Sequence, residues 1–264
     1  MQDASLWSLF SDLRFGRPRS LGGRPEAGRT GRPCFVAEGR ILVEDLLAWG
    51  RKGRAEVVAV AAEAGHEEAV RPLLPEGTAL LTASRAELEA MAGFPFHRGL
   101  MAAARVPEPP PLSALPAASR ILVLPALSDA ENLGQLIRTA AALGLDGLLL
   151  GPGPDPFSRR AVRVSMGASW KLPLWRTDQP WEALEAWRAP GGEVIAAALA
   201  NSVPVSAWKP GPRTALVLGP EGPGLAPGDV SRCTRAVRIP MAEGVDSLNV
   251  AAAGAILMHR MMEP

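Results

Sequence analysis

The stretch RIPMAEGVDSLNVAAAGAILMHR, residues 238–260, leads from an apolar, strand-like segment through a polar loop into a helix rich in alanine. Ser247 and Asn249 stand where that helix begins, and free N–H groups and the positive end of the helix dipole collect at such a place. An N-cap at Asp246 or Ser247 would account for one polar residue and leave the rest unexplained. Small side chains at 251–255 allow a neighbouring element or a second chain to approach closely. The stretch therefore predicts a ligand at the helix entrance and tight packing along the helix.

The same succession of apolar run, loop and helix recurs from Arg120 onward. The apolar runs are ILVLPA (121–126), GLLLG (147–151), EVIAAAL (193–199), TALVLG (214–219) and AVRIP (236–240). Such runs are typical of strands that are buried on both faces of a parallel sheet. Helical patterns lie at 131–143, 158–168, 181–188 and 247–262. The alternation predicts an open α/β sheet, in which ligands bind at the carboxyl ends of the strands.

Two other strand ends carry residues suited to a ligand. Asn132 and Arg138 follow the first run, and their spacing of under two helical turns would let them converge on one ligand. An arginine offers phosphate a planar fork, although a solvent-facing arginine on an amphipathic helix is the plainer alternative. Glu221 follows the fourth run between Gly219 and Gly222, which either let the backbone approach a ligand or merely form a turn. The spacing of these glycines matches neither a Walker A loop nor GxGxxG.

The residues before Arg120 fall into three segments. Alternating strand and helix patterns predict a small α/β domain over 34–104, in which Ser84 and Glu87 form a capping box. Five prolines mark 105–118 as a semi-rigid linker. Residues 1–33 contain six arginines and three acids and are expected to form a basic, flexible arm. Such an arm would either neutralise phosphates or simply be solvated.

Composition narrows the class of protein. The formal net charge is +1, so overall charge does not indicate a nucleic-acid partner. Two distant cysteines and three scattered histidines predict neither a disulfide framework nor a metal site. The chain has no apolar run of membrane-spanning length and no signal-peptide core at its start, so a cytoplasmic protein without membrane attachment is expected.

Three segments taken together resemble the signature motifs of one family. DAENLGQLIRTAAALG (129–144), LVLGPEGPGL (216–225) and IPMAEGVDSLNVAAAGAILM (239–258) resemble those of the SpoU (TrmH) family of RNA ribose 2′-O-methyltransferases, in the SPOUT class. RRAVRVSMGAS (159–169) resembles the segment between motifs one and two, and the resemblance covers 120–262. FVAEGRILVEDLL (35–47) and FHRGLMAA (96–103) resemble the substrate-binding domain of many members, which has a ribosomal-protein-like RNA-binding fold.

The resemblance implies a fold, a cofactor and an assembly. Residues 119–264 would form a SPOUT methyltransferase domain with a parallel sheet and a deep trefoil knot, and the protein would be a homodimer through this domain. S-adenosylmethionine (AdoMet) would be held mainly by backbone groups of three loops. The implied cofactor-binding residues are Leu199, Ala200, Asn201, Leu218, Gly219, Gly222, Ile239, Pro240, Met241, Ser247 and Leu248.

The implied reaction is an in-line attack of a ribose 2′-hydroxyl on the sulfonium methyl, for which no metal is needed. A guanidinium is a poor base, so we expect Arg138 to clamp the neighbouring phosphate and to stabilise negative charge on O2′, while a phosphate oxygen or water takes the proton. Asn132 would orient the ribose or Arg138, and Glu221, Ser247 and Asn249 would order the pocket.

RNA would be bound by the small domain together with Arg138 and three arginines near the site, Arg159, Arg160 and Arg163. The alternative for these three is that they form a solvated helix face. Ribosomal RNA is expected ahead of transfer RNA. Two alternatives stay open: a non-catalytic RNA-binding protein of the same fold, and a nucleotide-dependent oxidoreductase, which would need a fingerprint that the first strand lacks.

Overall fold

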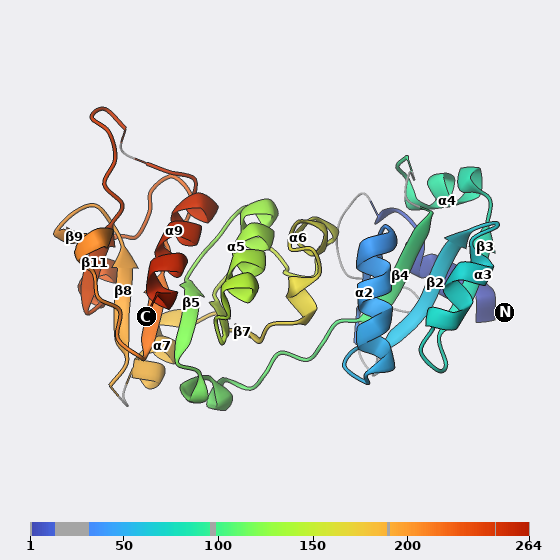
Figure 1. Cartoon of the computed structure of the whole chain (residues 1–264), viewed down its shortest axis with the longest axis horizontal. Helices are drawn as coiled ribbons and strands as arrows, with labels where there is room; N and C mark the ends of the chain where they lie inside the picture. The colour runs from blue at the N-terminus through green and yellow to red at the C-terminus, as the bar shows by residue number, and fades with distance from the viewer. Residues whose placement is uncertain (1, 14–31, 96–98, 189–190, 246, 264) are drawn as a thin grey trace. The chain divides into compact units, whose positions relative to one another are not determined.

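The computed structural model describes residues 2–13, 32–95, 99–188, 191–245 and 247–263 (Figure 1). They divide into two compact units. The N-terminal unit comprises the chain up to Glu108 together with Asp155–Trp170, and the C-terminal unit comprises Pro109–Pro154 and Lys171 onward. No helix in the described ranges has the length and apolar composition needed to cross a membrane.

The N-terminal unit contains a four-stranded sheet in the order β1-β4-β2-β3. Strands β2 and β3 pair in parallel and the other pairs are antiparallel. The predicted capping box is confirmed, because Ser84 and Glu87 exchange hydrogen bonds at the start of α4. The strands are β1 (Cys34–Glu38), β2 (Val57–Glu63), β3 (Ala79–Ala83) and β4 (Leu100–Arg105), and the helices are α2 (Arg40–Arg51), α3 (Glu67–Val70) and α4 (Arg85–Ala92).

The start of the chain differs from the basic, flexible arm expected over 1–33. Helix α1 (Gln2–Trp7) and the 3₁₀ turn η1 (Ser8–Phe10) are folded, and Leu9 and Phe10 are fully buried in the core of the unit. The expectation was wrong for this part because the arginines, glycines and prolines begin only after residue 13, whereas the first ten residues carry large apolar side chains. Residues 14–31 of the predicted arm lie outside the described residues.

The segment 155–170 packs on the N-terminal sheet although its sequence belongs with the motif-bearing half of the chain. It contains α6 (Arg159–Val164) and the 3₁₀ turn η5 (Ala168–Trp170). The ring of Phe35 on β1 lies 5.2 Å from the ring of Phe157 and 5.4 Å from that of Trp170, centroid to centroid. These aromatic contacts, at both ends of α6, explain why the segment joins the N-terminal unit.

The C-terminal unit is built on a seven-stranded sheet in the order β7-β6-β5-β10-β8-β11-β9. Every pair is parallel, as the sequence predicts. The order reverses at β5, which separates β6 from β10, and such reversals favour ligand binding at the strand ends. The strands are β5 (Arg120–Leu124), β6 (Gly147–Leu150), β7 (Leu174–Arg176), β8 (Glu193–Ala197), β9 (Ser202–Pro204), β10 (Thr214–Val217) and β11 (Arg235–Arg238).

Helices cover this sheet, and part of the expected linker joins its core. Leu115 in the 3₁₀ turn η4 (Leu112–Ala117) is buried in one core cluster with Trp187, and of the expected linker only 106–111 and Ala118 lie outside regular structure. Strands β7 and β9 and helix α8 were not predicted, because each is short and shows no periodicity. The helices are α5 (Ala130–Leu143), α7 (Pro180–Arg188), α8 (Pro227–Ser231) and α9 (Val250–Met262).

The alanine-rich helix α9 packs tightly within its own chain, against α5 (Figure 1). A Cβ atom added at Gly254 would lie 2.4 Å from Cδ2 of Leu136 on α5 and 2.9 Å from Cδ1 of Leu218. The predicted tight packing is therefore confirmed at this glycine, and its partner is α5 of the same chain. Ile256 lies on the uncovered side of α9 and is 43% exposed.

Candidate active site

Three loops enclose one cavity of about 720 Å³ at the carboxyl ends of β8, β10 and β11. The loops span 197–201, 218–225 and 239–250, and they are the ones in which the sequence places a cofactor. The volume lies within the range of about 300–1,000 Å³ that is usual for cofactor sites. Every implied cofactor-binding residue lines the cavity except Pro240.

The wall of the cavity fits a ligand held by backbone groups and apolar side chains. Leu199 and Leu248 line it and are 51% and 43% exposed, although large apolar side chains are normally buried. A Cβ atom at Gly219 would lie 2.4 Å from the backbone of Gly224 and of Leu225. A glycine at this position therefore lets the two ends of the second loop approach each other closely. Gly222 lines the cavity with φ +88° and has open space where a side chain would stand. The loop therefore leaves room for a flat group against its backbone.

At one edge of the cavity, side chains from three distant segments form a continuous hydrogen-bonded chain. Asn132 Nδ2 donates to Glu221 Oε1 at 3.0 Å, and Asn249 Nδ2 donates to Asn132 Oδ1 at 2.9 Å. Ser128 donates to Glu221 Oε2 through its backbone N–H at 3.1 Å and its hydroxyl at 2.9 Å. Three of the predicted catalytic residues, Asn132, Glu221 and Asn249, are thus brought together.

The chemistry of the two ends fixes the orientation of both amides. Glu221 as a carboxylate only accepts, so Asn132 must present its NH₂ group there and its oxygen to Asn249. Asn249 Oδ1 in turn accepts from the backbone N–H groups of Ala251 at 2.8 Å and Ala252 at 3.3 Å. Asn132 is 9% exposed, so each of its polar groups needs the partner it has.

Asn249 is therefore the N-cap of α9, which corrects the alternative that Asp246 or Ser247 caps the helix. Asp246 lies outside the described residues. Ser247 is exposed and lines the cavity two residues before the cap. The two polar residues before α9 thus have different roles. Asn249 joins the helix to the hydrogen-bonded chain, and Ser247 faces the cavity.

Opposing effects act on the pKa of Glu221. Desolvation raises it, but hydrogen bonds from Asn132, from its own backbone and from both groups of Ser128 lower it, and the net result is a pKa below the ordinary value. Glu221 also lies beside the first turn of α5, where Asp129 caps the helix by accepting from Glu131 and Asn132. The carboxylate is thus ionised at neutral pH, with both oxygens already accepting hydrogen bonds.

Arg138 does not join this cluster. It lies on the exposed side of α5, does not line the cavity, and makes no hydrogen bond or ion pair with any described residue. Six residues separate it from Asn132, which turns the two side chains about 120° apart around the helix. The convergence of Asn132 and Arg138 that the spacing allowed is therefore not found within one chain.

Of the three arginines expected to bind RNA, Arg159 has a structural partner. Its guanidinium pairs with the carboxylate of Glu38 on β1, with Nη2 3.0 Å from Oε2, and lies 3.7 Å from the ring centroid of Phe94. Glu38 is only 8% exposed, so the pair compensates a buried charge. Arg160 is exposed and Arg163 half-buried on the same helix.

Two residues near the cavity were not expected from the sequence. Ser128 carries no motif signal, and its contact with Glu221 joins positions that are 93 residues apart. Arg238 lines the cavity, and its guanidinium donates to the backbone oxygen and the hydroxyl of Ser202. Neither contact follows from local periodicity.

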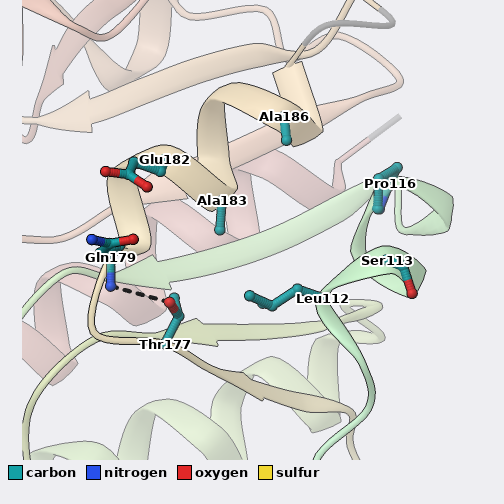
Figure 2. A pocket seen from close by; sticks show the side chains of 8 residues that line it. All are labelled: Leu112, Ser113, Pro116, Thr177, Gln179, Glu182, Ala183 and Ala186. Carbon is teal, nitrogen blue, oxygen red and sulfur yellow. Dashed lines mark hydrogen bonds between the residues drawn. The ribbon is translucent and has the colours of Figure 1, made fainter.

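A second hollow in the C-terminal unit, of about 350 Å³, lies between η4 and α7 and contains none of the predicted site residues. Figure 2 shows Leu112 reaching into it from η4, across from Ala183 on α7. Glu182 is its one charged lining residue among those described. Its polar lining residues are Ser113, Thr177, Gln179 and Glu182, and none of them belongs to the three motifs.

A parallel α/β sheet, with a cavity among three loops at the carboxyl ends of its strands and a polar cluster beside it, is the arrangement of an α/β enzyme that binds its ligand at the strand ends. The chain belongs to the SpoU rRNA Methylase family, whose model matches residues 119–259, and the membership expected from the three motifs is confirmed.

Known relatives extend over most of the chain. An uncharacterized tRNA/rRNA methyltransferase of Mycobacterium tuberculosis is 36% identical over 251 residues, which cover 91% of this chain and 84% of the relative. The 23S rRNA (guanosine(2553)-2′-O)-methyltransferase RlmP of Bacillus subtilis is 29% identical over 234 residues, 88% of this chain and 90% of RlmP. The AdoMet-bound rRNA methyltransferase of Sinorhizobium meliloti superposes with a TM-score of 0.74 at 28% identity, covering 86% of each chain.

Proposed function

We propose that this protein transfers a methyl group from AdoMet to a ribose 2′-hydroxyl of RNA. The observation that carries the proposal is the meeting of three motifs, which lie more than a hundred residues apart at their extremes, around one cavity with a polar cluster at its edge. RlmP is a 2′-O-methyltransferase by name, and the S. meliloti relative has AdoMet bound.

The cofactor would be held by residues already described. Backbone groups of 199–201, 218–222 and 239–241 offer donors and acceptors to the adenine edge, and Leu199 and Leu248 offer apolar cover. When bound, AdoMet supplies a methyl group that its sulfonium already activates. The chain need only bring the hydroxyl oxygen within about 3 Å of that methyl, and such positioning supplies several kcal/mol of the barrier.

Glu221 is not the base in this proposal, because both of its oxygens are engaged and its pKa is lowered by Asn132 and Ser128 despite desolvation. Glu221, Asn132 and Asn249 hold the pocket in shape, and Ser247 borders the cavity. Arg138 clamps the phosphate next to the target ribose and stabilises negative charge that develops on O2′. The proton leaves to a phosphate oxygen or to water.

The exposed position of Arg138 has a consequence for assembly. We place the second half of the RNA site on another copy of the chain, so that the protein acts as a homodimer through the C-terminal unit. Arg138 on α5 and Ile256 on α9 are both exposed, and the small residues of α9 would let a second copy approach closely. The knot expected at the carboxyl-terminal loops belongs to the same proposal.

RNA selection is assigned to the N-terminal unit, for which a ribosomal-protein-like RNA-binding fold is part of the proposal, and to Arg160 and Arg163. Arg159 is left out because it already pairs with Glu38. Ribosomal RNA is the preferred substrate class, since RlmP acts on 23S rRNA by name, and transfer RNA is the alternative. A cytoplasmic location follows from this substrate.

The test is transfer of a radiolabelled methyl group from AdoMet to bulk RNA from a source that lacks the modification, followed by digestion to nucleosides. The proposal expects label in a 2′-O-methylated nucleoside. RNA binding without any label transfer would favour the non-catalytic alternative, and label in a base-methylated nucleoside would assign a different SPOUT reaction.

A further inference from the structure

We infer that Ser128 is a positioning residue of the methyl-transfer site, which acts by fixing the plane of the Glu221 carboxylate and through it the loop 219–225 that forms one wall of the cofactor cavity. This inference rests on the proposed function for the identity of the ligand. Ser128 lies outside the cavity lining and is not one of the residues that the motifs single out.

The carboxylate of Glu221 receives hydrogen bonds on both of its oxygens. Asn132 donates to Oε1, and a donor on one oxygen restrains the position of that oxygen more than the plane of the group. Ser128 supplies two donors to the other oxygen, from its backbone N–H at 3.1 Å and from its hydroxyl at 2.9 Å. The two sides together fix the carboxylate across the first turn of α5.

The loop that carries Glu221 needs such an anchor. Gly222 and Gly224 have φ of +88° and +68°, and a turn rich in glycine and proline has few side chains of its own to pack. One backbone bond, from Gly224 N–H to the oxygen of Pro220 at 3.1 Å, closes the turn. Glu221 is thus the side-chain link from this wall to α5, and Asn132 carries the link on to α9.

The hydrogen bond from Ser128 also affects the pKa of Glu221. The hydroxyl of Ser128 donates to the ionised form of Glu221, so its removal raises the pKa of that carboxyl group. The loop would then lose its anchor at a higher pH than in the wild type. This shift separates a positioning role from simple loss of packing, because Ser128 is exposed and fills no core space.

The experiment compares Ser128→Ala with Ser128→Thr, which keeps the hydroxyl, and with Ser113→Ala, an exposed serine at the second hollow (Figure 2). Calorimetry measures the affinity for AdoMet between pH 3 and pH 7, where Glu221 titrates, and hydrogen exchange follows the non-proline amides of 219–225 without cofactor. We expect Ser128→Ala to weaken AdoMet binding about three- to tenfold at neutral pH, since one exposed hydrogen bond to a charged group is lost.

In Ser128→Ala the amides of the loop should exchange faster. Its affinity for AdoMet should begin to fall at a higher pH than that of the wild type, as the solution is made acidic. The affinities of the other two variants should stay within about twofold of the wild type. Unchanged affinity, exchange and pH profile in Ser128→Ala would overturn the inference. If the wild type binds no AdoMet at all, the proposed function fails, and the exchange rates of the loop alone then decide whether Ser128 anchors it.

Discussion

At the scale of single residues, the polar side chains beside the cavity hydrogen-bond to one another, whereas Arg138, the proposed RNA contact, lies outside that cluster. Glu221, Asn132 and Asn249 satisfy each other, whereas Arg138 is exposed and has no partner among the described residues. A charged side chain that the fold does not use is available to a substrate. Arg138 is therefore the residue whose loss should affect the reaction and leave the fold intact.

Arg138→Ala is expected to lower the methyl-transfer rate by about a hundredfold or more, because it removes a donor to charge that develops in the transition state. The affinity for AdoMet should stay within about twofold, since Arg138 does not line the cavity. Gln135→Ala, an exposed position on the same helix, is the matched control. Single-turnover rates and calorimetry measure the two quantities, and a wild-type rate in Arg138→Ala would refute the role.

Arg159 and Arg163 should behave differently although both lie on α6. Arg159→Ala leaves the carboxylate of Glu38 buried without its partner, at a cost of about 1–3 kcal/mol in the free energy of unfolding. Arg163→Ala should leave stability nearly unchanged and weaken RNA binding. Denaturant unfolding and RNA titration measure the two effects, and equal loss of stability in both variants would contradict the assignment.

The pKa of Glu221 predicts the sign of a pH effect on stability. Because the folded-state pKa lies below the unfolded one, the carboxylate stabilises the fold above the unfolded pKa, and this contribution disappears as pH falls through the folded pKa. Glu221→Gln should therefore destabilise the protein at neutral pH and lose this difference at acidic pH. Unfolding curves between pH 3 and pH 7 measure the difference, and a gap that does not change with pH would be inconsistent with an ionised Glu221.

At the scale of elements, the local patterns could predict the strands and the ends of several helices. The apolar runs of β5, β8, β10 and β11 and the capping box of α4 are visible in the sequence because they depend on neighbouring residues. The meeting of three loops was expected from the resemblance to the SpoU family, whereas the parallel strands indicate only that a ligand binds at their carboxyl ends. The packing of α6 on β1 and the contact of Ser128 with Glu221 could not be predicted, because neither leaves a periodic signal.

Packing of α9 on α5 gives a prediction at this scale. Gly254→Leu should cost about 1–3 kcal/mol in the free energy of unfolding, because the new side chain meets Leu136 and Leu218 at close range. Ala252→Leu, on the exposed side of the same helix, should cost much less. Thermal unfolding of the two variants measures the contrast, and equal costs would show that α9 does not pack on α5 as described.

At the scale of the whole molecule, the proposed function requires two copies of the chain to form the site and positively charged side chains to bind RNA. The strand order β7-β6-β5-β10-β8-β11-β9 could not be predicted, because periodicity says nothing about which strands become neighbours. The folded start of the chain was not predicted for another reason. Its few apolar residues are followed directly by an arginine-rich segment, which is typical of a flexible arm. Both features depend on contacts across long stretches of sequence.

A change at Ile256 tests the assembly. Ile256→Asp adds a charge to the exposed face of α9 and should convert a dimer into monomers, which sedimentation velocity distinguishes. Loss of the dimer should lower the rate of methyl transfer. The AdoMet-binding loops should stay folded. A wild-type protein that sediments as a monomer and methylates RNA at full rate would exclude the dimeric site.

The most direct measurement of the central claim is a crystal structure of the protein with AdoMet bound. We expect the ligand between the loops 199–201, 218–222 and 239–248, with its methyl group toward the edge occupied by Asn132, Glu221 and Asn249. AdoMet bound elsewhere, for instance in the hollow beside Leu112 and Glu182, with the three-loop cavity closed, would contradict it.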